Sequence, residues 1–157
     1  MTTTQTIDQA IAAMPLLSGL STRQRKRLST TATTRSYPAG SVILREGDTS
    51  MAMYVLLSGS ARVECTGSDG RSIALGVLNA GAYFGEMGLI DDTVRCTSVI
   101  ALEPTHCILL GKWDFEKAMR DDAEIGLALL RTLNARVRRL EAQLAAHEQE
   151  LAAVAQR

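Results

Sequence analysis

Short apolar runs separated by turn residues fill the middle of the chain, between Ser36 and Gly111. Runs such as Met53-Tyr54-Val55-Leu56-Leu57 have the length and the branched and aromatic composition that are typical of β-strands. Between two of these runs, Asp69-Gly70 is a strong signal for a tight hairpin turn. Many short strands with regularly spaced turns predict a β-roll or jelly-roll barrel.

Helical spacing precedes this β-rich region. Ile7, Ile11 and Met14 recur at helical intervals, and Ser21 is placed to cap a second short helix. The basic residues between positions 23 and 27 could suggest binding to phosphate or nucleic acid. No aromatic residues are interleaved with them, so a solvated helix face is the favoured interpretation.

A long helix is predicted from Asp114 to the end, where the chain has no proline and one glycine, Gly126. Its apolar positions alternate in spacing between three and four residues and include one histidine: Leu130, Leu133, Val137, Leu140, Leu144, His147, Leu151 and Val154. This heptad pattern is typical of a coiled coil and favours a homodimer through residues 130–154. A long amphipathic helix folded back on its own barrel is the alternative.

The predicted fold class is therefore mainly β with flanking helices. It is a β-roll or jelly-roll barrel with N-terminal helices and a long C-terminal coiled-coil helix. The predicted boundaries are 1–35 for the N-terminal helical segment, 36–113 for the β-roll and 114–157 for the C-terminal helix. The residues after Leu140 are fewer than the roughly 40 that the smallest independent domains need, so no DNA-binding domain is expected.

Composition narrows the possible functions. The chain has 17 basic and 17 acidic residues, and this balance removes the electrostatic case for tight nucleic-acid binding. Cys65, Cys96 and Cys107 lie far apart and form no metal-ligand motif, which is typical of reduced thiols in the cytoplasm. No apolar stretch has the length of a signal sequence or a membrane span. A cytoplasmic location is the expectation.

The segment richest in candidate chemistry is Phe84-Gly85-Glu86-Met87-Gly88, and Arg95-Cys96-Thr97 follows at the start of the next strand. A helix beginning near Gly85 would aim free N–H groups at an anion. The glycines allow close approach of the backbone, and Arg95 can grip phosphate oxygens. Glu86 would repel a phosphate and should instead accept from a hydroxyl, such as a ribose 2′-OH. A glycine-rich loop with a surface Glu–Arg ion pair fits these residues equally well.

In order and spacing, these residues resemble the phosphate-binding cassette of the cyclic-nucleotide-binding domain family, and the resemblance runs from about Leu16 to Leu140. The family includes the bacterial catabolite activator, the regulatory subunits of the cyclic-AMP-dependent kinase and cyclic-nucleotide-gated channels. The resemblance implies that Glu86 takes the ribose 2′-OH and that Arg95, with nearby N–H groups, holds the cyclic phosphate. The implied ligand-binding residues are Phe84, Gly85, Glu86, Met87, Gly88, Arg95, Cys96, Thr97 and Leu140.

Three positions depart from the family pattern. Cys96 stands where many members have Ala, Ser or Thr, and a thiol is only a weak donor. We therefore expect cAMP to be preferred over cGMP. Val94 replaces a common proline, and Leu140 falls where the catabolite activator has a polar pair that reaches the adenine. The base is then expected to be capped differently, by apolar packing or by an arginine of the long helix.

The resulting hypothesis is a cytoplasmic cyclic-nucleotide sensor that signals through its C-terminal helix. The alternative is a degenerate, non-binding β-roll that serves as a dimeric scaffold or as a docking module for an unidentified protein. An enzyme is not expected, because His106 and His147 are the only histidines and form no His-x-His pair for a metal. Neither a metal cofactor, nor a membrane association, nor direct DNA binding is predicted.

Overall fold

A computed structural model of the chain describes the backbone of residues 3–90 and 93–155. Within these ranges it describes the side chains of all residues except 3–5, 136, 150 and 152–155. The elements follow in this order: α1 (Thr3–Ala13), η1 (Pro15–Leu17), α2 (Thr22–Ser29), β1 (Thr33–Tyr37), β2 (Val42–Leu44), β3 (Ala52–Ser58), β4 (Ser60–Thr66), β5 (Ser72–Asn79), β6 (Tyr83–Phe84), α3 (Met87–Ile90), β7 (Ser98–Ala101), β8 (Thr105–Gly111), α4 (Lys112–Asp121) and α5 (Ala123–Ala155).

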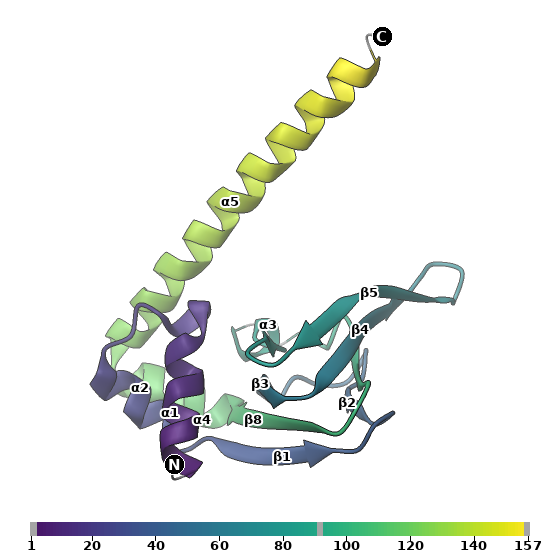
Figure 1. Cartoon of the computed structure of the whole chain (residues 1–157). Helices are drawn as coiled ribbons and strands as arrows, with labels where there is room; N and C mark the ends of the chain where they lie inside the picture. Colours follow the sequence, from purple (N-terminus) through teal and green to yellow (C-terminus); the bar gives the residue numbers. More distant parts are fainter. Residues whose placement is uncertain (1–2, 91–92, 156–157) are drawn as a thin grey trace.

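The strands form two antiparallel four-stranded sheets, with the orders β1-β8-β3-β6 and β2-β7-β4-β5 (Figure 1). The predicted β-roll with flanking helices is confirmed, but the strands do not close into a barrel. Residues of both sheets meet in one apolar cluster that includes Leu56, Ala61, Val99 and Cys107. This cluster is the core between the two sheets.

The hairpin predicted at Asp69-Gly70 joins β4 to β5, which pair from Ser60↔Asn79 to Thr66↔Ser72. Gly70 has φ +78°, a left-handed conformation that glycine adopts without a steric penalty. The Gly67 N–H donates to the Arg71 carbonyl at 2.8 Å and closes the turn. The hairpin signal in the sequence is therefore confirmed.

A second apolar cluster lies on the other face of the β1-β8-β3-β6 sheet, where the helices cover it. The alternation of strand side chains assigns Val55 and Ile108 to this cluster, while their neighbours Leu56 and Cys107 face the first cluster. Phe115 of α4 is fully buried among the helices. The sheet that carries β6 is consequently held between two apolar layers.

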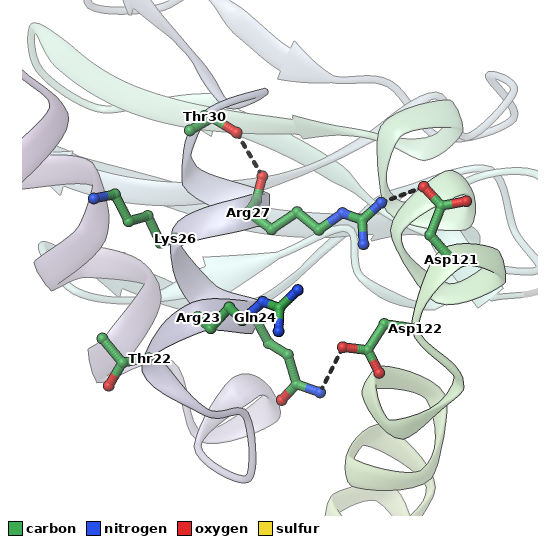
Figure 2. A pocket seen from close by; sticks show the side chains of 8 residues that line it. All are labelled: Thr22, Arg23, Gln24, Lys26, Arg27, Thr30, Asp121 and Asp122. Carbon is green, nitrogen blue, oxygen red and sulfur yellow. Dashed lines mark hydrogen bonds and ion pairs between the residues drawn. The ribbon is translucent and has the colours of Figure 1, made fainter.

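Helix α2 is tied to the junction of α4 and α5 (Figure 2). Ser21 is the predicted N-cap, and with Gln24 it forms a capping box. Gln24 Nε2 also donates to Asp122 Oδ2 at 3.0 Å, and Arg27 pairs with Asp121. A hydrogen bond from Lys117, with added attraction from Arg27, lowers the pKa of the Asp121 carboxyl. Arg27, one of the basic residues of α2, thus forms an ion pair within the chain.

Helix α5 changes its surroundings along its length. Ile125 and Leu129 are buried against the helical cluster, whereas the later part of the helix extends away from the sheets (Figure 1). At least half of each of these heptad side chains is exposed: Leu130, Val137, Leu140, Leu144 and Leu151. The side chain of Val154 lies outside the described residues. Among the helices that the structure describes, none is long and apolar enough to span a membrane.

Candidate functional site

Gly85 turns the chain sharply where β6 ends. Phe84, the last residue of β6, is buried and stacks on Tyr54 of β3 with ring centroids 5.2 Å apart. Gly85 has φ +76°, which disfavours any residue with a side chain. A Cβ at this position would also lie 2.6 Å from Nη1 of Arg95. Glycine is therefore required here both by the backbone conformation and by the close approach of the arginine.

Helix α3 follows directly after Glu86. It begins at Met87, close to Gly85, where the sequence predicts the start of a short helix, and it has four residues. Leu89 is buried and anchors α3 to the helical cluster, while Met87 is exposed. The first N–H groups of any helix have no acceptor within the helix. Such groups can donate to a bound anion.

Arg95 is 8% exposed and uses its guanidinium within the chain. Nη1 donates to the Gly85 carbonyl at 2.7 Å, and Nη2 donates to the Ala52 carbonyl. Its backbone is held at both ends, because its N–H donates to Asp48 and its carbonyl accepts from Gly47, each at 2.8 Å. Burial lowers the pKa of Arg95, while the nearby Tyr54 and Glu86 oppose that shift. The structure thus fixes a buried cation under the turn at Gly85.

The predicted residues are brought together unequally. Gly85 and Arg95 are in direct contact, and Glu86 is near enough for its charge to oppose the lowering of the Arg95 pKa by burial. Cys96 is exposed, and Thr97 is half-buried beside it. Leu140 does not join them, since it is 52% exposed on the part of α5 that extends away from the sheets.

Neither of two hollows in the described part of the chain gathers all the predicted site residues. One of about 230 Å³ adjoins Arg95, with Tyr54, Asp48 and Thr49 among its lining residues, but Glu86 and Gly88 do not line it. A larger one of about 730 Å³ lies between α2 and the α4–α5 junction (Figure 2) and contains none of the predicted site residues. The candidate site is therefore defined by the contacts of Arg95 rather than by the larger of these two hollows.

Three contributors to the site were not found in the sequence. The Ala52 carbonyl accepts from Arg95, and a backbone carbonyl leaves no signal in a sequence. Ser50 is 2% exposed, and its Oγ has no hydrogen-bond partner among the residues that the structure describes. The sequence places Tyr54 in a predicted strand, where an aromatic residue is interpreted as part of the apolar core. In the structure, Tyr54 lines the hollow beside Arg95.

The sequence profile of the family described as "Cyclic nucleotide-binding domain" matches residues 34–122. This range holds both sheets apart from the first residue of β1, the segment from Gly85 to Arg95, and α4. The chain belongs to this family. The predicted membership of this family is thereby confirmed.

Known relatives are similar over about two thirds of the chain. A cAMP-dependent protein kinase regulatory subunit of Aspergillus niger is 35% identical over 106 residues, which cover 68% of this chain and 25% of the relative. A cyclic AMP receptor protein of Thermus thermophilus is 33% identical over 110 residues, which cover 70% of this chain and 51% of the relative. The chain thus spans between a quarter and about half of the length of these curated relatives.

A solved structure shares the fold over most of the chain. The N-terminal domain of a transcriptional regulator from Streptomyces coelicolor superposes with a TM-score of 0.75 at 27% identity. The match covers 83% of this chain and 94% of that domain. Among the residues that the structure describes here, no three His, Cys, Asp or Glu side chains gather where they could hold a metal ion.

Proposed function

We propose that this chain binds a cyclic nucleotide, cAMP in preference to cGMP, and signals its presence through α5. The observation that supports this most directly is the buried guanidinium of Arg95 in contact with Gly85, inside the region that matches the family. A cation held at 8% exposure against two carbonyls is positioned to meet an anion that approaches the turn.

In this proposal the cyclic phosphate is bound by Arg95 and by backbone N–H groups near Gly85, Met87 and Gly88. Hydrogen bonds from a cation to a carbonyl oxygen are weaker than bonds to a phosphate, because only the latter join opposite charges. A bound phosphate can therefore compete with the Gly85 carbonyl for the guanidinium. The exchange gives the ligand a direct effect on the backbone of the turn.

Glu86 is proposed to accept from the ribose 2′-OH. A ligand without that hydroxyl loses a hydrogen bond to a charged acceptor, which contributes about 1.5–3 kcal/mol. We expect 2′-deoxy-cAMP to bind about tenfold or more weakly than cAMP to the wild-type protein. In Glu86→Ala, calorimetry should show most of this difference lost. Equal binding of the two ligands by the wild type would remove Glu86 from the ribose role.

The preference for cAMP rests on Cys96 and on the relatives. A thiol at position 96 offers little to the amino group that distinguishes guanine. The Aspergillus and Thermus relatives both carry cyclic AMP in their names. Leu140 is proposed as an apolar contact for the base. For this contact, either α5 of the same chain moves toward the site, or Leu140 of a second chain approaches it.

The output is proposed to pass through a parallel homodimer formed by residues 130–154. The exposed heptad side chains support this, because they have no apolar surface to cover them in the single chain. The division into an N-terminal helical segment, a β-roll and a C-terminal helix is kept as part of the proposal. The competing function is a scaffold that dimerises without binding a ligand, and it involves the same homodimer.

Calorimetric titration with cAMP and cGMP tests the proposal. We expect saturable binding of cAMP to the wild type and a loss of about 10- to 100-fold in affinity for Arg95→Leu, since charge-assisted bonds contribute about 1.5–3 kcal/mol. Arg71→Leu is the matched control, because the Arg71 side chain is 87% exposed on the hairpin. No binding to the wild type would favour the scaffold, and full affinity in Arg95→Leu would place the site elsewhere.

A further inference from the structure

Gly88, the second residue of α3, is in contact with Ser50. Its φ is not positive, so its backbone conformation alone would accept alanine. A Cβ at position 88 would nevertheless lie 1.7 Å from Ser50 Oγ and 2.1 Å from Ser50 Cβ. Rotation of the serine side chain moves Oγ but leaves Cβ in place. Gly88 is therefore glycine because Ser50 occupies the space that a side chain would need.

Ser50 belongs to a short segment that contacts several parts of the candidate site. The neighbouring Ala52 carbonyl accepts from Arg95, and the Met51 carbonyl accepts from the Lys112 N–H at 2.9 Å. Ser50 itself is 2% exposed with an unpartnered Oγ among the described residues. Its fit against Gly88 is thus one of shape and not of hydrogen bonding.

Lys112 holds Gly88 from α4. It is the first residue of that helix, its side chain is 11% exposed, and Nζ donates to the Gly88 carbonyl at 3.3 Å. The same ammonium lies 4.0 Å from Glu116 Oε1, one turn further along α4. A shift of α3 therefore changes the partners of a charge that belongs to α4. This helix leads directly into α5.

We propose that Ser50 and Lys112 are positioning residues that hold α3 at Gly88, Ser50 by filling the space beside its Cα and Lys112 by binding its carbonyl. Through Lys112, a displacement of α3 by the ligand is passed to α4 and on to α5. This inference rests on the proposed binding of a cyclic nucleotide at the same segment.

The chain carries its own reporter for this contact. Trp113 is the single tryptophan, is 69% exposed, and follows Lys112 on α4. It lines a hollow of about 360 Å³ together with Ser50, Met51 and Lys112. We therefore expect its fluorescence to respond to changes at the contact between α3 and α4.

The shape of the contact is tested with Gly88→Ala, Ser50→Gly and the double variant, in the full chain. We expect Gly88→Ala to weaken cAMP binding about tenfold or more, as for an overpacked contact. In the double variant, where the space is restored, affinity should return to within about threefold of wild type. Gly126→Ala is the matched control, since no atom lies within 4 Å of a Cβ there. Unchanged affinity in Gly88→Ala, or no recovery in the double variant, overturns the role of Ser50.

Ser50→Ala keeps this test decisive if Gly88→Ala does not fold. It retains the Cβ and removes the unpartnered hydroxyl, so affinity should stay within about twofold while the melting temperature is unchanged or higher. A larger loss of affinity would show that the hydroxyl acts instead of the shape, and would overturn the proposal.

The link to α4 is tested with Lys112→Met, and with Lys117→Met as a control on the exposed side of the same helix. Wild type and control should show a change in Trp113 emission that saturates at the calorimetric dissociation constant. At saturating cAMP, Lys112→Met should lose most of this change. If cAMP binds with heat and Trp113 does not respond, or if Lys112→Met responds like wild type, the inference is wrong. If wild type shows no heat, the proposed function fails, and the inference fails with it.

Discussion

The two sheets and the distal half of α5 bury their apolar residues differently. The sheets and the surrounding helices enclose two apolar clusters within one chain, and Arg95 finds its acceptors there as well. The heptad positions from Val137 to Leu151 remain exposed. An isolated helix in water is only marginally stable. We infer that one chain suffices to bring Arg95 to Gly85 and Ala52, whereas the distal helix depends on a second surface.

The largest expected effect separates the two regions by their stability. Phe115→Ala removes a fully buried ring from the helical cluster and should lower the free energy of unfolding by about 3–5 kcal/mol. Leu144→Ala, at a position 60% exposed, should change it by about 0.5 kcal/mol or less while the protein is monomeric. Urea denaturation at low protein concentration measures both. Similar losses in the two variants would contradict the comparison.

Next in size is the effect on association. Light scattering at micromolar concentration should give the mass of two chains for the wild type. Leu140→Asp combined with Leu144→Asp should give one, because each leucine buried in a seam contributes about 1.5–3 kcal/mol. Gln143→Asp, at an exposed polar position between them, is the control. A monomeric wild type would refute the dimer, and a loss of cAMP affinity confined to the double variant would support Leu140 as a base contact.

The smallest expected effect sharpens the comparison inside the β-roll itself. Burial raises the pKa of the Cys107 thiol to about 11, whereas Cys96 is exposed beside Arg95. The thiolate is the reactive form, so at pH 8 an alkylating reagent should modify Cys96 first and Cys107 only after unfolding. Mass spectrometry of timed samples measures both rates. Bound cAMP should slow the reaction of Cys96, and an unchanged rate would place this thiol away from the ligand.

The buried Cys107 thiol also makes the free energy of unfolding depend on pH in the alkaline range. Because the folded state keeps its proton up to a pKa of about 11 while the unfolded thiol ionises near 9.0, the folded state binds more protons between these values. The free energy of unfolding should therefore be fully present below pH 9 and fall as the pH rises toward 11. In urea titrations, the free energy of unfolding of the Cys107→Ala variant should fall less steeply over this pH window.

Local signals in the sequence were sufficient for several elements, but not for the break at Asp122, which divides the single helix predicted from Asp114 into α4 and α5. Asp69-Gly70 specified its hairpin because the turn is decided by the residues within it. Ser21 specified its cap for the same reason, and the alternation along β3 placed Val55 and Leu56 on opposite faces. The segment from Phe84 to Gly88 and Arg95 was also recognised, since its order and spacing are contained in the chain.

Only the tertiary structure decided the contacts between segments that are far apart in the sequence. No local rule gives the strand orders β1-β8-β3-β6 and β2-β7-β4-β5, or shows that the two sheets of the predicted β-roll do not close into a barrel. The Ala52 carbonyl under Arg95 and the fit of Ser50 against Gly88 depend on how the loops pack. The direction of α5 is likewise set by the burial of Ile125 and Leu129 against the helices and not by its heptads. Periodicity determines which face of an element is apolar, but packing at close range determines what that face meets.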